Sequence, residues 1–140
     1  MHYVSFESVQ KAVECIAKQL PNDIDYIIGI SRGGLVPGVM LSHILNKPLI
    51  TTRIQTRDGN RKTIEPDVAD LASVNKCVFV DDINDTGYTI NLIRDQIQSP
   101  TIFATLYARY STSALGVISA VTINSDEWIV FPWENTNNDI

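Results

Sequence analysis

The chain has 140 residues, a net charge of −5, 44% hydrophobic residues and 19% charged residues. This length allows one domain with a substantial core, and the composition is that of a globular chain, which excludes intrinsic disorder. The acidic balance argues against nucleic acid as a partner, because proteins that bind it neutralise phosphates with lysine and arginine. We therefore expect a single domain over residues 1–140.

The sequence contains no signal for a membrane. The N-terminus lacks the basic-then-apolar order of a signal peptide, and no apolar run approaches the roughly 20 residues that span a bilayer. Cys15 and Cys77 form no metal-binding or redox pattern and fit two reduced, packed thiols. We expect a cytoplasmic protein with no membrane partner.

Helical and extended patterns alternate along the chain. Apolar residues recur at helical spacing over 5–20, where Ser5 suits the N-cap and Pro21 ends the helix. A second helix ends near Leu45, and a third is expected over 88–97. This alternation predicts an α/β fold with a mostly parallel, twisted sheet flanked by helices. Short apolar runs predict the buried strands of that sheet, at 26–30, 49–54, 76–80, 101–108 and 117–123.

Two stretches stand outside this alternation. Residues 55–75 have weak periodicity and several charges, so we expect a loop there, with a short ordered piece near 68–71. The tail from Asn124 is polar except between Trp128 and Trp133.

The segment VFVDDINDTGYT follows an expected strand, and parallel sheets bind ligands beyond the carboxyl ends of their strands. A helix that begins there offers unpaired backbone N–H groups and a partial positive charge to a phosphate. Gly87 lets the backbone approach the anion closely, and Thr86 and Thr89 add hydroxyl donors. Asp81 and Asp82 suit ribose hydroxyls, or Mg²⁺ that bridges these hydroxyls and a pyrophosphate.

A simpler interpretation is that Asp85 or Thr86 caps the helix while Asp81 and Asp82 are solvated. Capping accounts for one such residue, but not for three carboxylates within five positions after an apolar strand. We therefore favour a site for a ribose phosphate.

This segment resembles the defining motif of the type I phosphoribosyltransferases, in which two acidic residues after an apolar strand precede D-T-G-x-T. The resemblance implies that Asp81 and Asp82 hold the ribose hydroxyls of 5-phosphoribosyl pyrophosphate, that Asp82 lies nearest Mg²⁺, and that Asp85 is the general base. It also implies that the 5′-phosphate lies in the turn made by Asp85, Thr86, Gly87, Tyr88 and Thr89.

A second stretch, ISRGG, resembles the pyrophosphate loop of the same family. The resemblance implies pyrophosphate contacts from Ser31, Arg32, Gly33 and Gly34, and a cis peptide bond between Ser31 and Arg32. Alone, this stretch also fits an ordinary strand-to-helix turn with a surface arginine. Beside the acidic motif we favour phosphate binding, because glycines give backbone access and Arg32 supplies charge.

The resemblance further identifies residues 55–75 as a flexible flap that closes over the active site. Arg61 matches a flap arginine that reaches pyrophosphate, whereas Arg53 and Arg57 fit a solvated loop equally well. Closure of such a flap excludes water from the reaction.

The segment DEWIVFPWE, residues 126–134, is similar to the C-terminal segment of bacterial xanthine-guanine phosphoribosyltransferases. The similarity implies a small base-binding hood over residues 124–140, with Trp128 stacked on a purine and Ile129 in backbone contact with it. The alternative is that the tryptophans pack the tail onto the sheet, which is the interpretation we favour for Trp133.

Arg109 stands where that subfamily has a lysine that donates to the purine 6-oxygen. Arginine can still donate, but the change leaves the preferred base open. We expect a purine phosphoribosyltransferase that acts on a 6-oxopurine (guanine, xanthine or hypoxanthine) and releases pyrophosphate. Its partners are then these small substrates, with Mg²⁺ as cofactor, and the family analogy favours a homodimer or homotetramer.

Three alternatives compete with this interpretation, and the intact acidic pair and phosphate turn argue against one of them, an interaction module with a degenerate site. A regulator on the same fold would bind phosphoribosyl pyrophosphate without catalysis, although this chain lacks the basic face and the added domain that mark such proteins. Transfer to a pyrimidine is the remaining alternative, and Trp128 argues against it.

Overall fold

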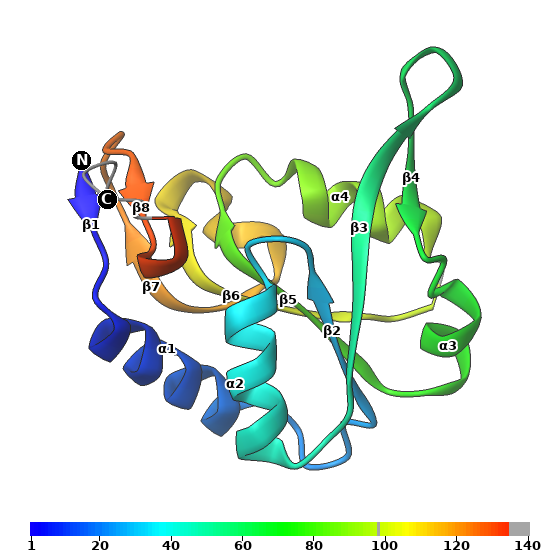
Figure 1. The fold of residues 1–140 in the computed structure, drawn as a ribbon, viewed down its shortest axis with the longest axis horizontal. Helices are drawn as coiled ribbons and strands as arrows, with labels where there is room; N and C mark the ends of the chain where they lie inside the picture. The colour runs from blue at the N-terminus through cyan, green and yellow to red at the C-terminus, as the bar shows by residue number, and fades with distance from the viewer. Residues whose placement is uncertain (98, 135–140) are drawn as a thin grey trace, which may run out of the picture.

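The computed structural model describes residues 1–97 and 99–134, which form an α/β fold around a six-stranded sheet (Figure 1). The strand order is β4-β3-β2-β5-β6-β7, and every neighbouring pair is parallel except β3 and β4. This confirms the predicted fold class. The strands of the sheet are β2 (Tyr26–Ile30), β3 (Leu49–Arg57), β4 (Arg61–Glu65), β5 (Cys77–Asn84), β6 (Ile102–Arg109) and β7 (Ile118–Ile123). The helices are α1 (Phe6–Gln19), α2 (Leu35–Leu45), α3 (Ala69–Val74) and α4 (Tyr88–Gln96), with short 3₁₀ helices at Asp58–Asn60, Tyr110–Leu115 and Pro132–Glu134.

Helices cover both faces of the sheet (Figure 1). One core cluster contains Ile16 of α1, Leu41 of α2 and Val80 of β5, and the other contains Ile93 of α4 and Phe79 of β5. Neighbouring residues of β5 therefore enter opposite cores, which explains why its sequence is apolar without alternation. Of the helices in the described part of the chain, none combines the length and apolarity needed to cross a bilayer.

The first helix begins and ends where the sequence predicts. The side-chain oxygen of Ser5 accepts a hydrogen bond from the backbone N–H of Ser8 at 3.1 Å, so Ser5 is the N-cap. Leu20 is the C-cap, and Pro21 follows it.

Two strands run further than the sequence predicts. β5 continues past Val80 to Asn84 and carries both aspartates of the acidic pair into the sheet. Asp81 is paired with Thr105 of β6, so the neighbouring strand satisfies backbone groups at positions where charged side chains indicate a loop. β3 likewise continues to Arg57 because β4 pairs with it.

The prediction of a loop over residues 55–75 is wrong. β3 and β4 form an antiparallel hairpin that projects beyond the rest of the molecule, and α3 supplies the short ordered piece expected near 68–71 (Figure 1). Most side chains of β4 are exposed or half-buried, and Ile64 alone among its five residues is buried. A two-stranded ribbon with little buried surface lacks the apolar alternation that reveals a strand.

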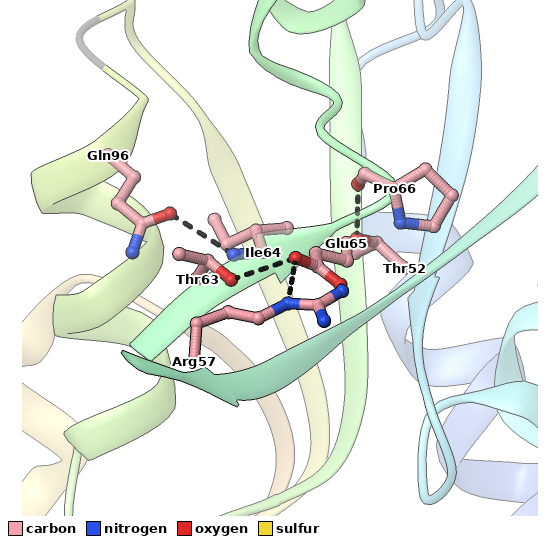
Figure 2. Close-up of polar contacts among 7 residues, drawn as sticks. All are labelled: Thr52, Arg57, Thr63, Ile64, Glu65, Pro66 and Gln96. Carbon is pink, nitrogen blue, oxygen red and sulfur yellow. Dashed lines mark hydrogen bonds and ion pairs between the residues drawn. The ribbon is translucent and has the colours of Figure 1, made fainter. Parts of the chain in front are cut away.

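Side chains hold the base of this hairpin, as Figure 2 shows. Gln96, the last residue of α4, accepts a hydrogen bond from the backbone N–H of Ile64 at 3.2 Å. Its amide nitrogen donates to the carbonyl of Lys62 at 3.0 Å. Within the hairpin, Nε of Arg57 donates to Oε1 of Glu65 at 2.7 Å. Gln96 therefore ties the outer edge of β4 to α4.

Replacing Gln96 by alanine is expected to loosen the hairpin without unfolding the domain. Both hydrogen bonds to β4 disappear, so exchange of the Ile64 amide hydrogen is expected to accelerate roughly tenfold, as loss of such bonds typically allows. Hydrogen exchange followed by NMR measures this directly. Gln10→Ala, the same substitution on the exposed face of α1, is the control. Unchanged protection of Ile64 in Gln96→Ala contradicts the proposed tether.

A second sheet, which the sequence does not predict, joins the two ends of the described chain. β1 (His2–Tyr3) and β8 (Ile129–Val130) are parallel, and the backbone N–H of Val4 donates to the carbonyl of Val130 at 2.9 Å. The N-terminal residues thereby fix the segment that carries Trp128 and Ile129. Residues 135–140 of the predicted hood lie outside the described residues.

Candidate functional site

The predicted phosphate turn connects β5 to the start of α4. Gly87 is the N-cap with φ of 82°, a left-handed conformation that glycine adopts without strain. The backbone N–H of Tyr88 donates to Oγ1 of Thr86 at 3.3 Å. A cavity of about 240 Å³ lies at this turn and is lined by residues 81–90 and Thr105. The structure therefore places all five predicted phosphate-turn residues around one hollow at a helix N-terminus, a favourable place for an anion.

The acidic pair lies at the carboxyl end of β5. The backbone N–H of Asp82 donates to Oδ1 of Asp81 at 2.8 Å. Burial raises the pKa of Asp81 well above its ordinary value, and the charge of Asp82 adds to this rise. Burial also raises the pKa of Asp82, and the nearby carboxylate of Glu134 contributes. A cation or hydroxyl donors bound beside the pair would therefore stabilise its ionised carboxylates.

Asp81→Asn is expected to raise the melting temperature of the ligand-free protein at neutral pH. Because the pKa of Asp81 is raised in the folded state, its contribution to stability is complete below the ordinary value of 3.8 and is lost as pH rises through the raised pKa. Asparagine is neutral at every pH, so the difference in melting temperature between the variant and the native protein shrinks as pH falls. Thermal melts from about pH 4 to about pH 8 measure the difference.

Glu14→Gln, at an exposed position of α1, is the control for this comparison. An Asp81→Asn variant that melts below the native protein at neutral pH contradicts the cost assigned to burying the charge of Asp81 beside that of Asp82.

The predicted pyrophosphate loop turns sharply between β2 and α2. The peptide bond between Ser31 and Arg32 is cis, as the resemblance implied. A Cβ added at Gly33 would lie 2.4 Å from the carboxylate carbon of Asp82, and one at Gly34 would lie 2.0 Å from the Val80 carbonyl oxygen. Glycine at both positions therefore lets this loop lie directly against β5, with Gly33 beside the Asp82 carboxylate and Gly34 beside the Val80 backbone. A cavity of about 660 Å³ opens here, lined by Arg32, Gly33, Leu35, Val36, Asp82, Trp133 and Glu134.

The three predicted base-binding residues meet in a third hollow. This cavity of about 170 Å³ is lined by Asp82, Ile83, Asp85, Arg109, Trp128, Ile129, Phe131 and Glu134. Trp128 is 66% exposed, so its ring is accessible to a flat ligand, whereas Ile129 is buried. Arg109 closes another side of the hollow, where its Nε donates to Oδ1 of Asp85 at 2.9 Å.

Trp133 packs the tail against the core on one face of the sheet, in agreement with the packing role expected for it. Its ring stacks on Phe131 with centroids 5.1 Å apart and an interplanar angle of 3°. Phe6 of α1 meets the same ring edge-on at 6.5 Å. The contact with Phe6 fixes the hood segment against α1.

Sequence reasoning assigned no role to Glu134. The 3₁₀ turn Pro132–Glu134 folds it back, and its Oε1 accepts from the backbone N–H of Phe131 at 3.0 Å. Glu134 consequently lines both the base hollow and the pyrophosphate cavity, beside Asp82. The sequence alone does not reveal this position, because the 3₁₀ turn that directs Glu134 toward the site depends on how the hood packs.

The predicted flap arginine lies apart from these residues. Arg61 is the first residue of β4 and is exposed, and it is not among the residues that line the three cavities. A role for Arg61 at pyrophosphate thus requires movement of the hairpin and stays a prediction.

Comparison with known proteins identifies the family. The profile of the phosphoribosyl transferase domain matches residues 5–137, nearly the whole chain. The chain therefore belongs to the phosphoribosyltransferase family, and the resemblance seen at the acidic motif is confirmed.

Individual relatives agree with this assignment. A xanthine-guanine phosphoribosyltransferase of Idiomarina loihiensis is 30% identical over 139 residues, covering 94% of this chain and 86% of the relative. Another, from Desulfotalea psychrophila, is 31% identical over 137 residues, with 94% and 84% covered. Among solved structures, a purine phosphoribosyltransferase from Pyrococcus horikoshii superposes with a TM-score of 0.81 at 32% identity, over 96% of this chain and 95% of that one.

Proposed function

We propose that this protein transfers the 5-phosphoribosyl group of phosphoribosyl pyrophosphate to a 6-oxopurine, and so serves purine salvage in the cytoplasm. The observation that carries the proposal is the position of Asp82, which borders the phosphate hollow, the base hollow and the pyrophosphate cavity together. With the ribose bound at Asp82, the 5′-phosphate enters the phosphate hollow, the base enters the base hollow and the pyrophosphate enters the third cavity. The names of relatives with 30% and 31% identity support the same activity.

The acidic pair also fits a magnesium ion carried by the substrate. Mg²⁺ binds through one or two carboxylates together with substrate phosphates, and rarely in a cage made by protein alone. Across residues 1–97 and 99–134, no group of three or more histidine, cysteine or acidic side chains is arranged to hold a metal. The carboxylate of Asp82, and that of Asp81 beside it, would hold the ion, which supplies charge to neutralise the leaving pyrophosphate.

In this proposal, catalysis rests on positioning and charge. The phosphate turn and the pyrophosphate loop hold the two ends of phosphoribosyl pyrophosphate, while the acidic pair fixes its ribose hydroxyls. Loss of pyrophosphate leaves positive charge at the ribose carbon, and a purine nitrogen attacks that carbon. Asp85 accepts the proton that the purine releases, a role that typically contributes about 10²–10⁴-fold.

The base hollow favours a 6-oxopurine over adenine. A guanidinium carries only N–H donors, so Arg109 can pair with a 6-oxygen but not with the 6-amino group of adenine. Trp128 offers an exposed ring for a flat heterocycle. Family analogy adds a homodimer or homotetramer, which size-exclusion chromatography with light scattering measures.

The direct test is nucleotide formation. The purified protein is mixed with Mg²⁺, phosphoribosyl pyrophosphate and either guanine, hypoxanthine, xanthine or adenine. We expect turnover with at least one 6-oxopurine and much less with adenine. Binding of phosphoribosyl pyrophosphate without turnover of any base would instead support the non-catalytic regulator.

A further inference from the structure

We propose that Arg109 is a positioning residue that orients the carboxylate of Asp85 and joins the phosphate turn to the base-binding hood. This inference deepens the proposed function and rests on it. It differs from the role that the resemblance implies for position 109, which is contact with the purine alone.

Two hydrogen bonds from one guanidinium carry the inference. Nε of Arg109 donates to Oδ1 of Asp85 at 2.9 Å, and Nη1 donates to the backbone carbonyl of Ser125 at 2.9 Å. The side chain of Arg109 is only 13% exposed, whereas that of Asp85 is 52% exposed. The guanidinium is therefore sheltered from water, and it holds the more exposed Asp85 carboxylate through Oδ1.

The planar shape of arginine suits this double contact. The N–H groups of a guanidinium point in fixed directions, so binding one acceptor sets the direction toward the other. A lysine ammonium is a single point charge that turns freely, and it does not hold two acceptors in a defined plane. Arginine at position 109 thus has a structural use in this chain that a lysine at the same position would lack.

The contact with Ser125 extends the effect to the base. Ser125 lies three residues before Trp128, in the segment between β7 and β8. Arg109 is the last residue of β6, and Asp85 is the first residue after β5. The guanidinium therefore couples the proton acceptor to the segment that presents the ring proposed to stack on the base.

A double-mutant cycle tests the proposal. Turnover with the best 6-oxopurine is measured for the native protein, Asp85→Asn, Arg109→Gln and the double variant. Arg109→Gln is expected to lower kcat about 10- to 100-fold, a coupling of ordinary size for groups in contact. If Arg109 acts through Asp85, the double variant keeps the kcat of Asp85→Asn within about threefold. The purine is kept at saturation, so that loss of the contact between Arg109 and the 6-oxygen raises KM for the purine and leaves kcat to report on Asp85. Losses in kcat that multiply overturn the proposal, because Arg109 then acts on turnover independently of Asp85.

A conservative variant separates positioning from charge. Arg109→Lys keeps the charge but lacks the planar fork, so we expect kcat to fall while KM for phosphoribosyl pyrophosphate stays near the native value. Lys11→Gln, which removes an exposed cation on α1, is expected to match the native protein. Native kcat in Arg109→Lys contradicts the proposal.

A spectroscopic measurement needs no activity. The Nε–H signal of Arg109 is identified in ¹⁵N NMR spectra by its loss in Arg109→Lys. In the native protein we expect slow exchange of this hydrogen with water, and faster exchange in Asp85→Ala, which lacks the acceptor. Equal exchange rates in both proteins overturn the contact. Absence of turnover in the native protein would refute the proposed function but not the contact between Arg109 and Asp85, because the NMR measurement does not depend on activity.

Discussion

Asp85→Asn is expected to lower kcat with a 6-oxopurine by about 10²–10⁴-fold while leaving KM for phosphoribosyl pyrophosphate nearly unchanged. Asparagine has nearly the same shape, and its oxygen can still accept the hydrogen bond that Nε of Arg109 donates. The substitution therefore removes basicity while keeping the contact. Steady-state kinetics at several pH values measures the loss.

The control is Asp95→Asn, the same substitution on an exposed carboxylate near the other end of α4, which is expected to match the native protein. Full turnover in Asp85→Asn would exclude Asp85 as the general base, and the role would then have to pass to another group or to water.

Gly33→Ala is expected to weaken binding of magnesium phosphoribosyl pyrophosphate about 10- to 100-fold, the usual cost of disturbing a metal-binding carboxylate. The new methyl would lie 2.4 Å from Oδ2 of Asp82 and 2.6 Å from Oδ1, so the carboxylate must turn away. A side chain can turn without unfolding the sheet, so thermal stability is expected to stay close to the native value. Isothermal titration calorimetry and thermal melts measure the two effects.

The same substitution at two further glycines provides a comparison for Gly33→Ala. Gly38→Ala, one turn into α2, places its methyl 3.1 Å from the flexible side chain of Leu49 and is expected to bind normally. Gly34→Ala meets the backbone carbonyl of Val80 at 2.0 Å and is expected to disrupt folding itself. Normal binding in Gly33→Ala would place the ribose and metal away from Asp82.

The sequence predicts the parts of this molecule in which local chemistry decides the structure. The runs 26–30 and 101–108 are apolar because both faces of the sheet are covered, and this pattern needs no knowledge of partners. The motif around Asp85 and Gly87 is likewise local, since the turn and the helix that form the hollow come from adjacent residues.

What sequence reasoning missed depends on partners that are distant in the chain. β4 exists because β3 pairs with it, and β1 exists because β8 lies beside it at the other end of the chain. Glu134 reaches Asp82 only because the hood folds back over the sheet. The bond from Arg109 to Asp85 joins the ends of two neighbouring strands, and a comparison of position 109 with a lysine gives no sign of it.

The amide of Gln96 has a consequence for how the protein behaves among its own copies. β4 is the outermost strand of the sheet, and an open edge invites a strand of another molecule to add on. Gln96 presents one acceptor and one donor to the outward-facing Ile64 and Lys62, much as a neighbouring strand would. The side chain of Gln96 thus occupies the hydrogen-bonding groups of Ile64 and Lys62, which are then closed to a strand of another molecule at this part of the edge.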